Sequence, residues 1–507
     1  MWRLKKVCHK AGRHAGSQEE LRLRRREKER ALRQARRDSQ LVSKRLLLNE
    51  DEEQDSMEIT PGEQDVVRLL QQLQHSGTEK EAHLGALSKA LRSPSAQLAF
   101  IKLENSMHLL VSLLTGSDAR RRLLAVRCLH ELSHSRHASV ASAFLPATPY
   151  LLTYLSGQST KFTPYLLTYL SGQSTKFTEL CLYTLGNVCP DGEAVKERLL
   201  AQGIIPALAS CMQNQRHSLA VVEAAGFALF QLLQTKDAAQ KVIPMVLASD
   251  LPSLLLSVLT PDPEFGLAPA AECAWCLHSL TSSTEDHRVL LAQGALRKCS
   301  SLLVSLGGAV GDGNTEQGVE LLVCPLLRCV GNLLPSCPVE ALSAQLGDVH
   351  LVAPLCQLVF AFLQPLPALA REAAWVLNNL TAHCTESCAA LLTFNLVPRL
   401  VELLPFSQGI NTMVLRVLAN VAHKKKEFCT RLAELGLLSA ITATLKMANQ
   451  DMVTLSLELL FMMIVSSPQI AEQFVRQGGL SVLEAIQYNS EGEVRRRAAY
   501  LLEQHIL

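Results

Sequence analysis

Apolar residues along most of the chain recur with the period of an α-helix. In nine segments they fall at positions i, i+3, i+4 and i+7, which places them on one helix face. A single helix of this kind cannot bury its apolar face alone, so each must pack against a neighbour. The segments are LLAVRCLHELS, ELCLYTLGNVC, VEAAGFALFQLL, AECAWCLHSLT, PLLRCVGNLL, EAAWVLNNLTA, VLRVLANVA, SLELLFMMIV and RRRAAYLLEQ.

A shorter motif precedes each segment and gives the repeat length. Gly, Asn or another polar residue usually begins it, and apolar residues follow, as in GIIPAL and NLVPRL. Successive starts are 41, 57, 46, 45, 56, 45, 41 and 42 residues apart. Most of these spacings are those of armadillo and HEAT repeats, ~40–47 residues. The starts are Asn105, Pro146, Gly203, Ser249, Gly294, His350, Asn395, Gly436 and Gly478.

The two long spacings have local causes. Residues 148–162 (TPYLLTYLSGQSTKF) recur unchanged as residues 163–177, and removing one 15-residue copy shortens the spacing of 57 to 42. The spacing of 56 contains the glycine-rich stretch 306–318, which we predict to be a loop insertion. The sequence therefore predicts an all-α, armadillo/HEAT-type α-solenoid of about nine units over residues 79–507.

Charge separates the beginning of the chain from the rest. Residues 1–50 hold 16 Lys and Arg against 6 Asp and Glu, a net charge of +10. The other residues hold 33 against 41, a net charge of −8. We expect a basic, helical arm at residues 1–50, followed by an acidic linker at 51–78 that begins near EDEEQD. Such an arm suits an acidic partner, nucleic acid or the acidic body itself.

Composition excludes several classes of protein. Hydrophobic residues make up 48% and aromatic residues 5%, which does not fit a disordered, collagen-like or disulfide-framework chain. The 15 cysteines have no paired spacing, and no apolar segment follows the first basic residues. We therefore expect no secretory signal and reduced thiols, in the cytoplasm and nucleus.

Three short motifs resemble catalytic or metal sites. HELSH at residues 130–134 matches the HExxH pattern of zinc peptidases, but it falls inside a repeat helix and lacks a third ligand motif. CAWC at residues 273–276 lacks the strand–helix context of a redox motif. The glycine-rich stretch 306–318 lacks the GK[ST] ending of a phosphate-binding loop. We expect no enzyme, no metal and no cofactor.

One apolar stretch has the length of a membrane span. Residues 351–370 contain no charge, and about 20 residues suffice to cross a bilayer. They also contain three prolines and two glutamines, and they occupy the second-helix position of a repeat. A second stretch, 452–471, is interrupted by Glu458. We expect repeat helices in both places, with a membrane location as the alternative.

The arm carries an ordered basic pattern. Residues 22–46 read RLRRREKERALRQARRDSQLVSKRL, in which arginine forks suit carboxylates. This order resembles the importin-β-binding segment of the importin-α family, which implies an importin-β-like carrier as partner. A solvated or coiled-coil helix is the alternative, and without interleaved aromatic residues we expect no direct binding of nucleic acid. The matching residues include Arg24, Arg25, Arg26, Arg33, Arg36, Arg37, Lys44 and Arg45.

Several of the longer helices resemble the third helix of importin-α repeats. In that family a Trp and an Asn four residues later share a helix face and bind the lysine stems and backbone of a nuclear localisation signal. Trp375 and Asn379 match this pair fully. Other units keep the Asn with Tyr or Arg before it, whereas Arg127/Glu131, Phe227/Gln231 and Trp275/Ser279 lack it. The resemblance implies a peptide groove formed by Tyr183, Asn187, Asp191, Arg328, Asn332, Trp375, Asn379 and Asn420.

Arm, acidic linker and repeats follow one another in the order of the family. The resemblance therefore implies a nuclear import adaptor that binds basic signal peptides of cargo proteins. The alternative is an armadillo-repeat scaffold without cargo transport, with or without a membrane association.

Overall fold

The structure is a computed structural model of the chain, and it describes residues 63–75, 79–156, 174–190, 192–260, 266–283, 287–313, 318–405 and 409–506. The chain divides into two compact units, Met1–Thr60 and Pro61–Leu507, and every described residue belongs to the second. The basic arm, with all of its predicted carrier-binding residues from Arg24 to Arg45, lies outside the described residues.

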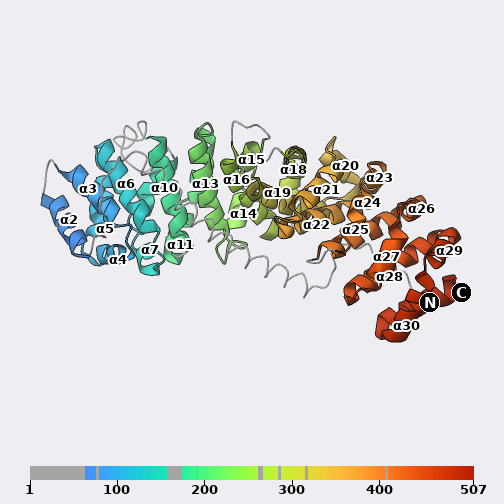
Figure 1. Cartoon of the computed structure of the whole chain (residues 1–507). Helices are drawn as coiled ribbons and strands as arrows, with labels where there is room; N and C mark the ends of the chain where they lie inside the picture. Colours follow the sequence, from blue (N-terminus) through green and yellow to red (C-terminus); the bar gives the residue numbers. More distant parts are fainter. Residues whose placement is uncertain are drawn as a thin grey trace. The chain divides into compact units, whose positions relative to one another are not determined.

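Every element in the described ranges is helical, and the fold is an α-solenoid (Figure 1). Most helices in the described part form nine units of three. The first helices are α4 (Pro94–Lys102), α7 (Ala138–Ser142), α11 (Glu193–Ala201), α14 (Val242–Leu247), α17 (Arg288–Ala292), α20 (Val339–Leu346), α23 (Thr385–Thr393), α26 (Lys426–Glu434) and α29 (Pro468–Arg476).

The second helices are α5 (Ser106–Leu114), α8 (Thr148–Ser156), α12 (Ile204–Asn214), α15 (Leu251–Val258), α18 (Ala295–Gly311), α21 (Val352–Phe362), α24 (Val397–Val401), α27 (Leu437–Thr444) and α30 (Gly479–Asn489). The third helices are α6 (Ala119–Ser133), α10 (Thr175–Val188), α13 (Leu219–Leu233), α16 (Leu267–Ser283), α19 (Val319–Leu333), α22 (Pro367–His383), α25 (Ile410–Lys424), α28 (Gln450–Ser466) and α31 (Gly492–Leu501).

The corner between first and second helices explains the Gly/Asn motif of the sequence. In six of the nine units a residue one or two positions before the second helix has a positive φ, between 50° and 84°. A side chain with a β-carbon is strained in this left-handed conformation, which Gly adopts freely and Asn tolerates best. The six residues are Asn105, Gly203, Gly294, Asn395, Gly436 and Gly478.

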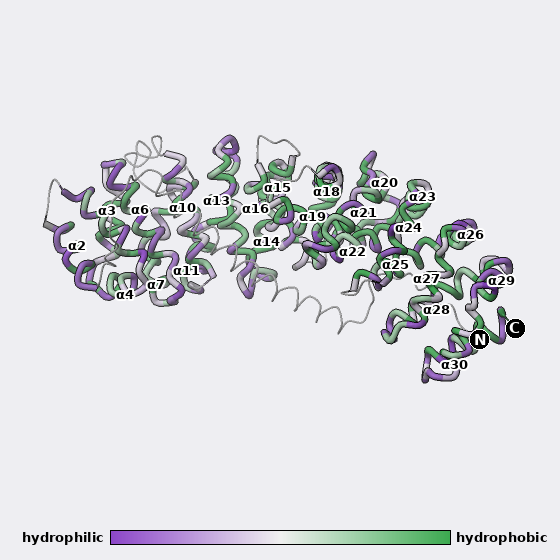
Figure 2. Tube along the Cα trace, in the orientation of Figure 1, coloured by the Kyte–Doolittle hydropathy of each residue, from purple (hydrophilic) through white to green (hydrophobic). Residues whose placement is uncertain are grey.

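Third helices of consecutive units pack directly against one another from α6 to α31. Their apolar residues join those of the second helices in one continuous buried core. In Figure 2 most helices carry both hydrophobic and hydrophilic residues, as expected where one face is buried. Each unit thus completes the core of its neighbours, and residues about 40 positions apart in sequence come into contact.

Two further helices precede the first predicted unit. They are α2 (Glu63–His75) and α3 (Lys80–Ala90), which pack against each other, and α3 also contacts α6. Val66, Leu69, Leu70 and Leu73 of α2 are buried. The residues predicted as an acidic linker, 51–78, therefore include a helix, because this apolar periodicity follows directly after the acidic stretch.

The described parts of the two 15-residue copies belong to one and the same unit. Residues 148–156 of the first copy form α8, and the last residues of the second copy begin α10 at Thr175. Tyr154 of α8 donates a hydrogen bond to the carbonyl of Leu114 (2.7 Å), and its ring meets that of Phe177 with a centroid distance of 4.8 Å. Residues 157–173 lie outside the described part.

Part of the predicted loop at 306–318 is helical instead. Helix α18 continues to Gly311, and Val310 in its last turn is buried. Gly307 makes this possible, since a β-carbon there would lie 2.8 Å from the ring of Pro354.

The apolar stretches of the sequence form packed repeat helices. Residues 351–370 are divided between α21 and α22, and residues 452–471 between α28 and α29. A different stretch, Val319–Ser336, is long and apolar enough to cross a membrane by length and composition. It comprises α19 and the following short 3₁₀ turn, and 67% of it is buried within the described fold, as in the core helix of a repeat.

Candidate functional site: the third-helix ladder

The stacking of third helices aligns equivalent residues of successive units. We call this column the ladder. Each unit contributes a first position, usually aromatic or Arg, and a second position four residues later on the same helix face. The ladder comprises Arg127/Glu131, Tyr183/Asn187, Phe227/Gln231, Trp275/Ser279, Arg328/Asn332, Trp375/Asn379 and Arg416/Asn420.

The side chain at a first position packs onto the third helix of the preceding unit. There it meets the residue just before the second ladder position of that unit. A β-carbon on Gly186 would lie 2.8 Å from the ring of Phe227, and one on Gly331 would overlap the ring of Trp375. Elsewhere a ring occupies that place, and Trp275 meets Phe230 with a centroid distance of 6.0 Å. The glycine before the ladder Asn, in LGNVC and VGNLL, is therefore what admits a large ring from the next unit.

The ladder asparagines donate hydrogen bonds to the preceding unit. Asn187 Nδ2 donates to Ser133 Oγ (3.1 Å), and Asn332 Nδ2 donates to Thr281 Oγ1 (3.3 Å). A side-chain amide has two N–H donors and one carbonyl acceptor, so a single bond of this kind leaves it further capacity.

The asparagines of the two following units reach backbone carbonyls. Asn379 Nδ2 donates to the carbonyl of Gly331 (3.0 Å). Asn420 Nδ2 donates to the carbonyl of Asn378 (3.1 Å) and also contacts Asn378 Oδ1 and Thr381 Oγ1, both at 3.2 Å. The side chains predicted to bind peptide thus already join neighbouring repeats.

The two halves of the ladder differ in exposure. Tyr183 is 4% exposed and Asn187 3% exposed. The Tyr183 hydroxyl donates to Glu223 Oε1 (3.3 Å), and burial together with this carboxylate raises the pKa of Tyr183 well above its usual value. In the other half, Asn332, Trp375 and Arg416 are half-buried, whereas Arg328, Asn379 and Asn420 are buried. The accessible ladder side chains from α19 to α25 are therefore Asn332, Trp375 and Arg416.

One arginine at a first position is paired with an acidic residue of the next unit. Arg328 Nη2 lies 3.6 Å from Glu372 Oε1 of α22, and both side chains are less than 10% exposed. A paired, buried guanidinium of this kind joins repeats and offers little free charge to a ligand. The predicted acidic residue Asp191 lies outside the described residues, so its place beside Tyr183 and Asn187 stays a prediction.

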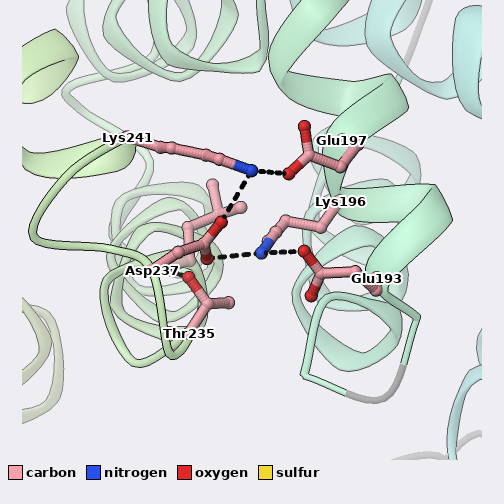
Figure 3. Close-up of polar contacts among 7 residues, drawn as sticks. Glu193, Lys196, Glu197, Thr235, Asp237 and Lys241 are labelled. Atoms are coloured by element: carbon pink, nitrogen blue, oxygen red, sulfur yellow. Dashed lines mark hydrogen bonds and ion pairs between the residues drawn. The ribbon is translucent and has the colours of Figure 1, made fainter.

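A cluster of charges outside the ladder joins α11 to the turn before α14 (Figure 3). Lys196 Nζ lies 2.5 Å from Asp237 Oδ1 and 2.6 Å from Glu193 Oε1, and its side chain is 1% exposed. Lys241 pairs with Glu197 and with Asp237 Oδ2 (3.0 Å). Hydrogen bonds from the two lysines hold the pKa of the Asp237 carboxyl well below its usual range.

This cluster includes the one group of metal-ligand type found among the described residues, Glu193, Glu197 and Asp237. Because two ammonium groups already bind these carboxylates, we interpret the cluster as an ion-pair network between units and not as a metal centre.

The catalytic motifs of the sequence are packed between helices. Glu131 of HELSH lies 3.5 Å from Arg92 Nε, and the rings of His130 and His134 meet edge to face with a centroid distance of 4.5 Å. Both cysteines of CAWC are fully buried, and burial raises the pKa of the Cys273 thiol. Such a thiol is a core side chain and a poor nucleophile.

Three-helix units stacked through their third helices define an armadillo-type repeat scaffold. The chain belongs to the TMCO6 family, whose model matches residues 161–506.

Comparison with known proteins adds one curated relative and two solved structures. Importin subunit alpha-9 of Arabidopsis thaliana is 26% identical over 296 residues, which are 58% of this chain and 50% of that protein. The chain thus spans about half the length of this relative. A crystal structure of an engineered protein is similar with a TM-score of 0.64 at 19% identity, over 87% of this chain and 98% of the other. A designed armadillo repeat protein in complex with the peptide (KR)4 is 22% identical over 50% of this chain and 99% of its own, with a TM-score of 0.41.

We predict that the close contact between Gly331 and Trp375 makes a larger residue at position 331 destabilising. Gly331→Ala should lower the free energy of unfolding by about 1–3 kcal/mol, because the added methyl group displaces the indole ring. The control is Gly85→Ala in α3, where a β-carbon meets nothing within 4 Å; this change should stabilise by up to ~1 kcal/mol. Urea denaturation compares the two variants. Equal stability of both would contradict the contact.

We predict that Asp237 stabilises the junction between α11 and α14 above acidic pH. Asp237→Asn should lower the free energy of unfolding by about 2 kcal/mol at pH 7. This is less than the ~3–5 kcal/mol lost when a buried charge keeps no partner, because Glu193 still pairs with Lys196. Since folding lowers the pKa of Asp237, its contribution is complete above the ordinary carboxyl range and is lost as the pH falls below it.

Urea titrations at pH 7 and at lower pH test this. The difference between wild type and Asp237→Asn should shrink as the pH falls below about 4. Glu193→Gln, at the exposed carboxylate of the network, is the control and should have a smaller effect. A difference that stays constant with pH would rule out this role of Asp237.

Proposed function

We propose that this protein is a non-enzymatic adaptor that holds an extended basic peptide, of the nuclear-localisation-signal type, along its ladder. Half-buried Trp375, whose ring lies over Gly331 next to the half-buried Asn332, is the observation that carries the proposal. The face of an indole attracts a lysine side chain, and amides at a regular spacing suit the backbone of an extended chain.

The peptide site lies in the half of the ladder from α19 to α25. Asn332 uses one amide donor for Thr281, and its amide carbonyl accepts no hydrogen bond from a described residue. Tyr183 and Asn187 are instead closed in by neighbouring side chains. The net charge of −8 outside the first 50 residues favours the approach of a basic segment. The similarity to importin subunit alpha-9 supports the same class of ligand.

The basic arm, in this proposal, recruits an importin-β-like carrier, and the protein acts in cytoplasm and nucleus. A repeat scaffold without transport is the second candidate. It is favoured by the ladder positions that depart from the Trp–Asn pattern, Glu131, Gln231 and Ser279. The scaffold would hold a partner other than a signal peptide in its groove, and any carrier binding by its arm would serve its own entry into the nucleus.

We predict that Trp375→Ala/Asn379→Ala weakens binding of a lysine-rich signal peptide at least tenfold. The change removes the cation–π contact of Trp375, about 2 kcal/mol when desolvated, and also the bond from Asn379 to the carbonyl of Gly331 beneath the ring. Fluorescence anisotropy with a labelled peptide measures the effect. Asn332→Ala is a milder variant at a half-buried position, and Asn214→Ala at an exposed position of α12 is the control. Unchanged capture by the double variant would exclude this part of the ladder.

We predict that the full chain binds an importin-β-like carrier through its arm. Changing Arg24, Arg25, Arg26, Arg36 and Arg37 together to Ala should abolish binding, whereas changing Lys5, Lys6 and Lys10 to Ala should not. Binding should weaken with salt, since exposed charges are screened. Pull-down with purified carrier tests this. Absence of carrier binding would contradict this role of the arm, and carrier binding without capture of a signal peptide would favour the scaffold without transport.

A further inference from the structure

In the half of the ladder from α19 to α25, one first position carries a charge that no described residue neutralises. Arg416 on α25 stands where the preceding unit has Trp375. Its guanidinium makes no ion pair or hydrogen bond with any residue in the described part of the chain, and its Nε is shielded from solvent. The residue as a whole is half-buried, so the rest of the guanidinium is within reach of a ligand.

The residue beneath the first position differs in this unit. Trp375 lies on Gly331 and Trp275 on Phe230 of the preceding third helices. The residue that should accommodate position 416 is Asn378, whose carbonyl and Oδ1 are already fixed by Asn420. A flexible, charged side chain at position 416 therefore lies beside a polar group, where the preceding units have glycine or an aromatic ring.

The arginine of the preceding arginine-bearing unit has an acidic partner. Arg328 is paired with Glu372 of the next third helix. One unit beyond Arg416, Glu458 of α28 is bound by Arg497 of α31, which also pairs with Glu493 at 2.9 Å. The carboxylate one helix along is therefore already engaged.

We propose that Arg416 forms a subsite for an anionic side chain, a carboxylate or a phosphate, of the peptide bound along the ladder. A half-buried guanidinium without an acceptor is incompletely solvated, and an anion supplies charge-assisted hydrogen bonds that water provides less well. This inference rests on the proposed function. It predicts a preference for peptides that carry an anionic residue over peptides with basic residues alone.

The spacing of the helices gives the position of the anion in the peptide. Packed helices lie about 8–10 Å apart, and an extended chain advances about 3.3 Å per residue. An acidic residue at Arg416 is therefore about three residues from the basic residue at Trp375. The preferred ligand is a mixed-charge segment, with Lys or Arg at one place and Asp, Glu or a phosphorylated Ser three residues away.

A peptide panel on the full chain tests the subsite. Each peptide has one lysine anchor and, three residues before or after it, Glu, phosphoserine, Ala or Lys. We expect the best Glu or phosphoserine peptide to bind at least fivefold more tightly than its Lys counterpart. Arg416→Ala should abolish this preference, and Arg416→Lys should retain part of it.

The matched control is Arg127→Ala. Arg127 is also a half-buried arginine at a first position of the ladder with a shielded Nε, but it lies on α6, far along the column from Trp375. Its removal should leave the preference unchanged. Similar affinity for Glu and phosphoserine would indicate a carboxylate site, and at least tenfold tighter binding of phosphoserine a phosphate site; both outcomes support the subsite.

Two results would overturn the inference. One is equal or tighter binding of the Lys peptide by the wild-type protein, and the other is an anion preference that persists in Arg416→Ala. If peptides bind in a Trp375-dependent manner without an anion preference, only this inference fails. If no peptide binds at all, the proposed function fails and the subsite fails with it.

Discussion

Consecutive third helices approach one another so closely that a large side chain of one unit lies directly on the backbone of the unit before it. Where that side chain is Phe227 or Trp375, the residue beneath it must be glycine, because a β-carbon would collide with the ring. Where the residue beneath is Phe230, two rings pack together instead. The identity of one residue in each third helix thus restricts the ladder residue of the next, and with it the chemistry of the candidate groove.

Polar groups follow the same nearest-neighbour principle. Ladder asparagines, the pair Arg328–Glu372 and the network around Lys196 all join adjacent units, with partners about 40–50 residues apart. In a solenoid each unit contacts only its neighbours, so its stability depends on such junctions. A side chain that both joins two repeats and binds a ligand must share its hydrogen-bond capacity. Asn332, with a single amide bond, retains more of that capacity than Asn420, which has three acceptors around its Nδ2.

Motifs that suggest chemistry in isolation acquire another meaning once their helices are packed. The acidic residue of HELSH lies beside Arg92, and the cysteines of CAWC are enclosed in the core. The apolar stretch 351–370 is interrupted between two helices, while the longer apolar helix that follows α18 is largely enclosed by neighbouring repeats. In each case the spacing of apolar residues had already predicted a repeat helix, and the structure places the segment in one.

The sequence by itself determined the all-α repeat architecture. Helical periodicity marked the nine third helices, and a Gly or Asn near the start of six second helices marked a left-handed corner that few residues tolerate, as at Gly203 and Asn395. These constraints are local, because each depends only on residues close together in the sequence. The extent of α18 was missed because it depends on burial against the next unit, where Gly307 meets Pro354. Helix α2 was missed although its apolar periodicity is visible, because the acidic stretch before it suggested a single linker.

Only the tertiary structure decided which ladder side chains are accessible. Tyr183 and Trp375 look equivalent in sequence, yet one is enclosed beside Glu223 and the other is half-exposed. Likewise, Arg328 and Arg416 occupy the same position of their units, but only Arg328 meets a carboxylate from the next helix. Exposure and charge pairing depend on residues one full repeat away, and the sequence pattern within a unit contains no information about that neighbour.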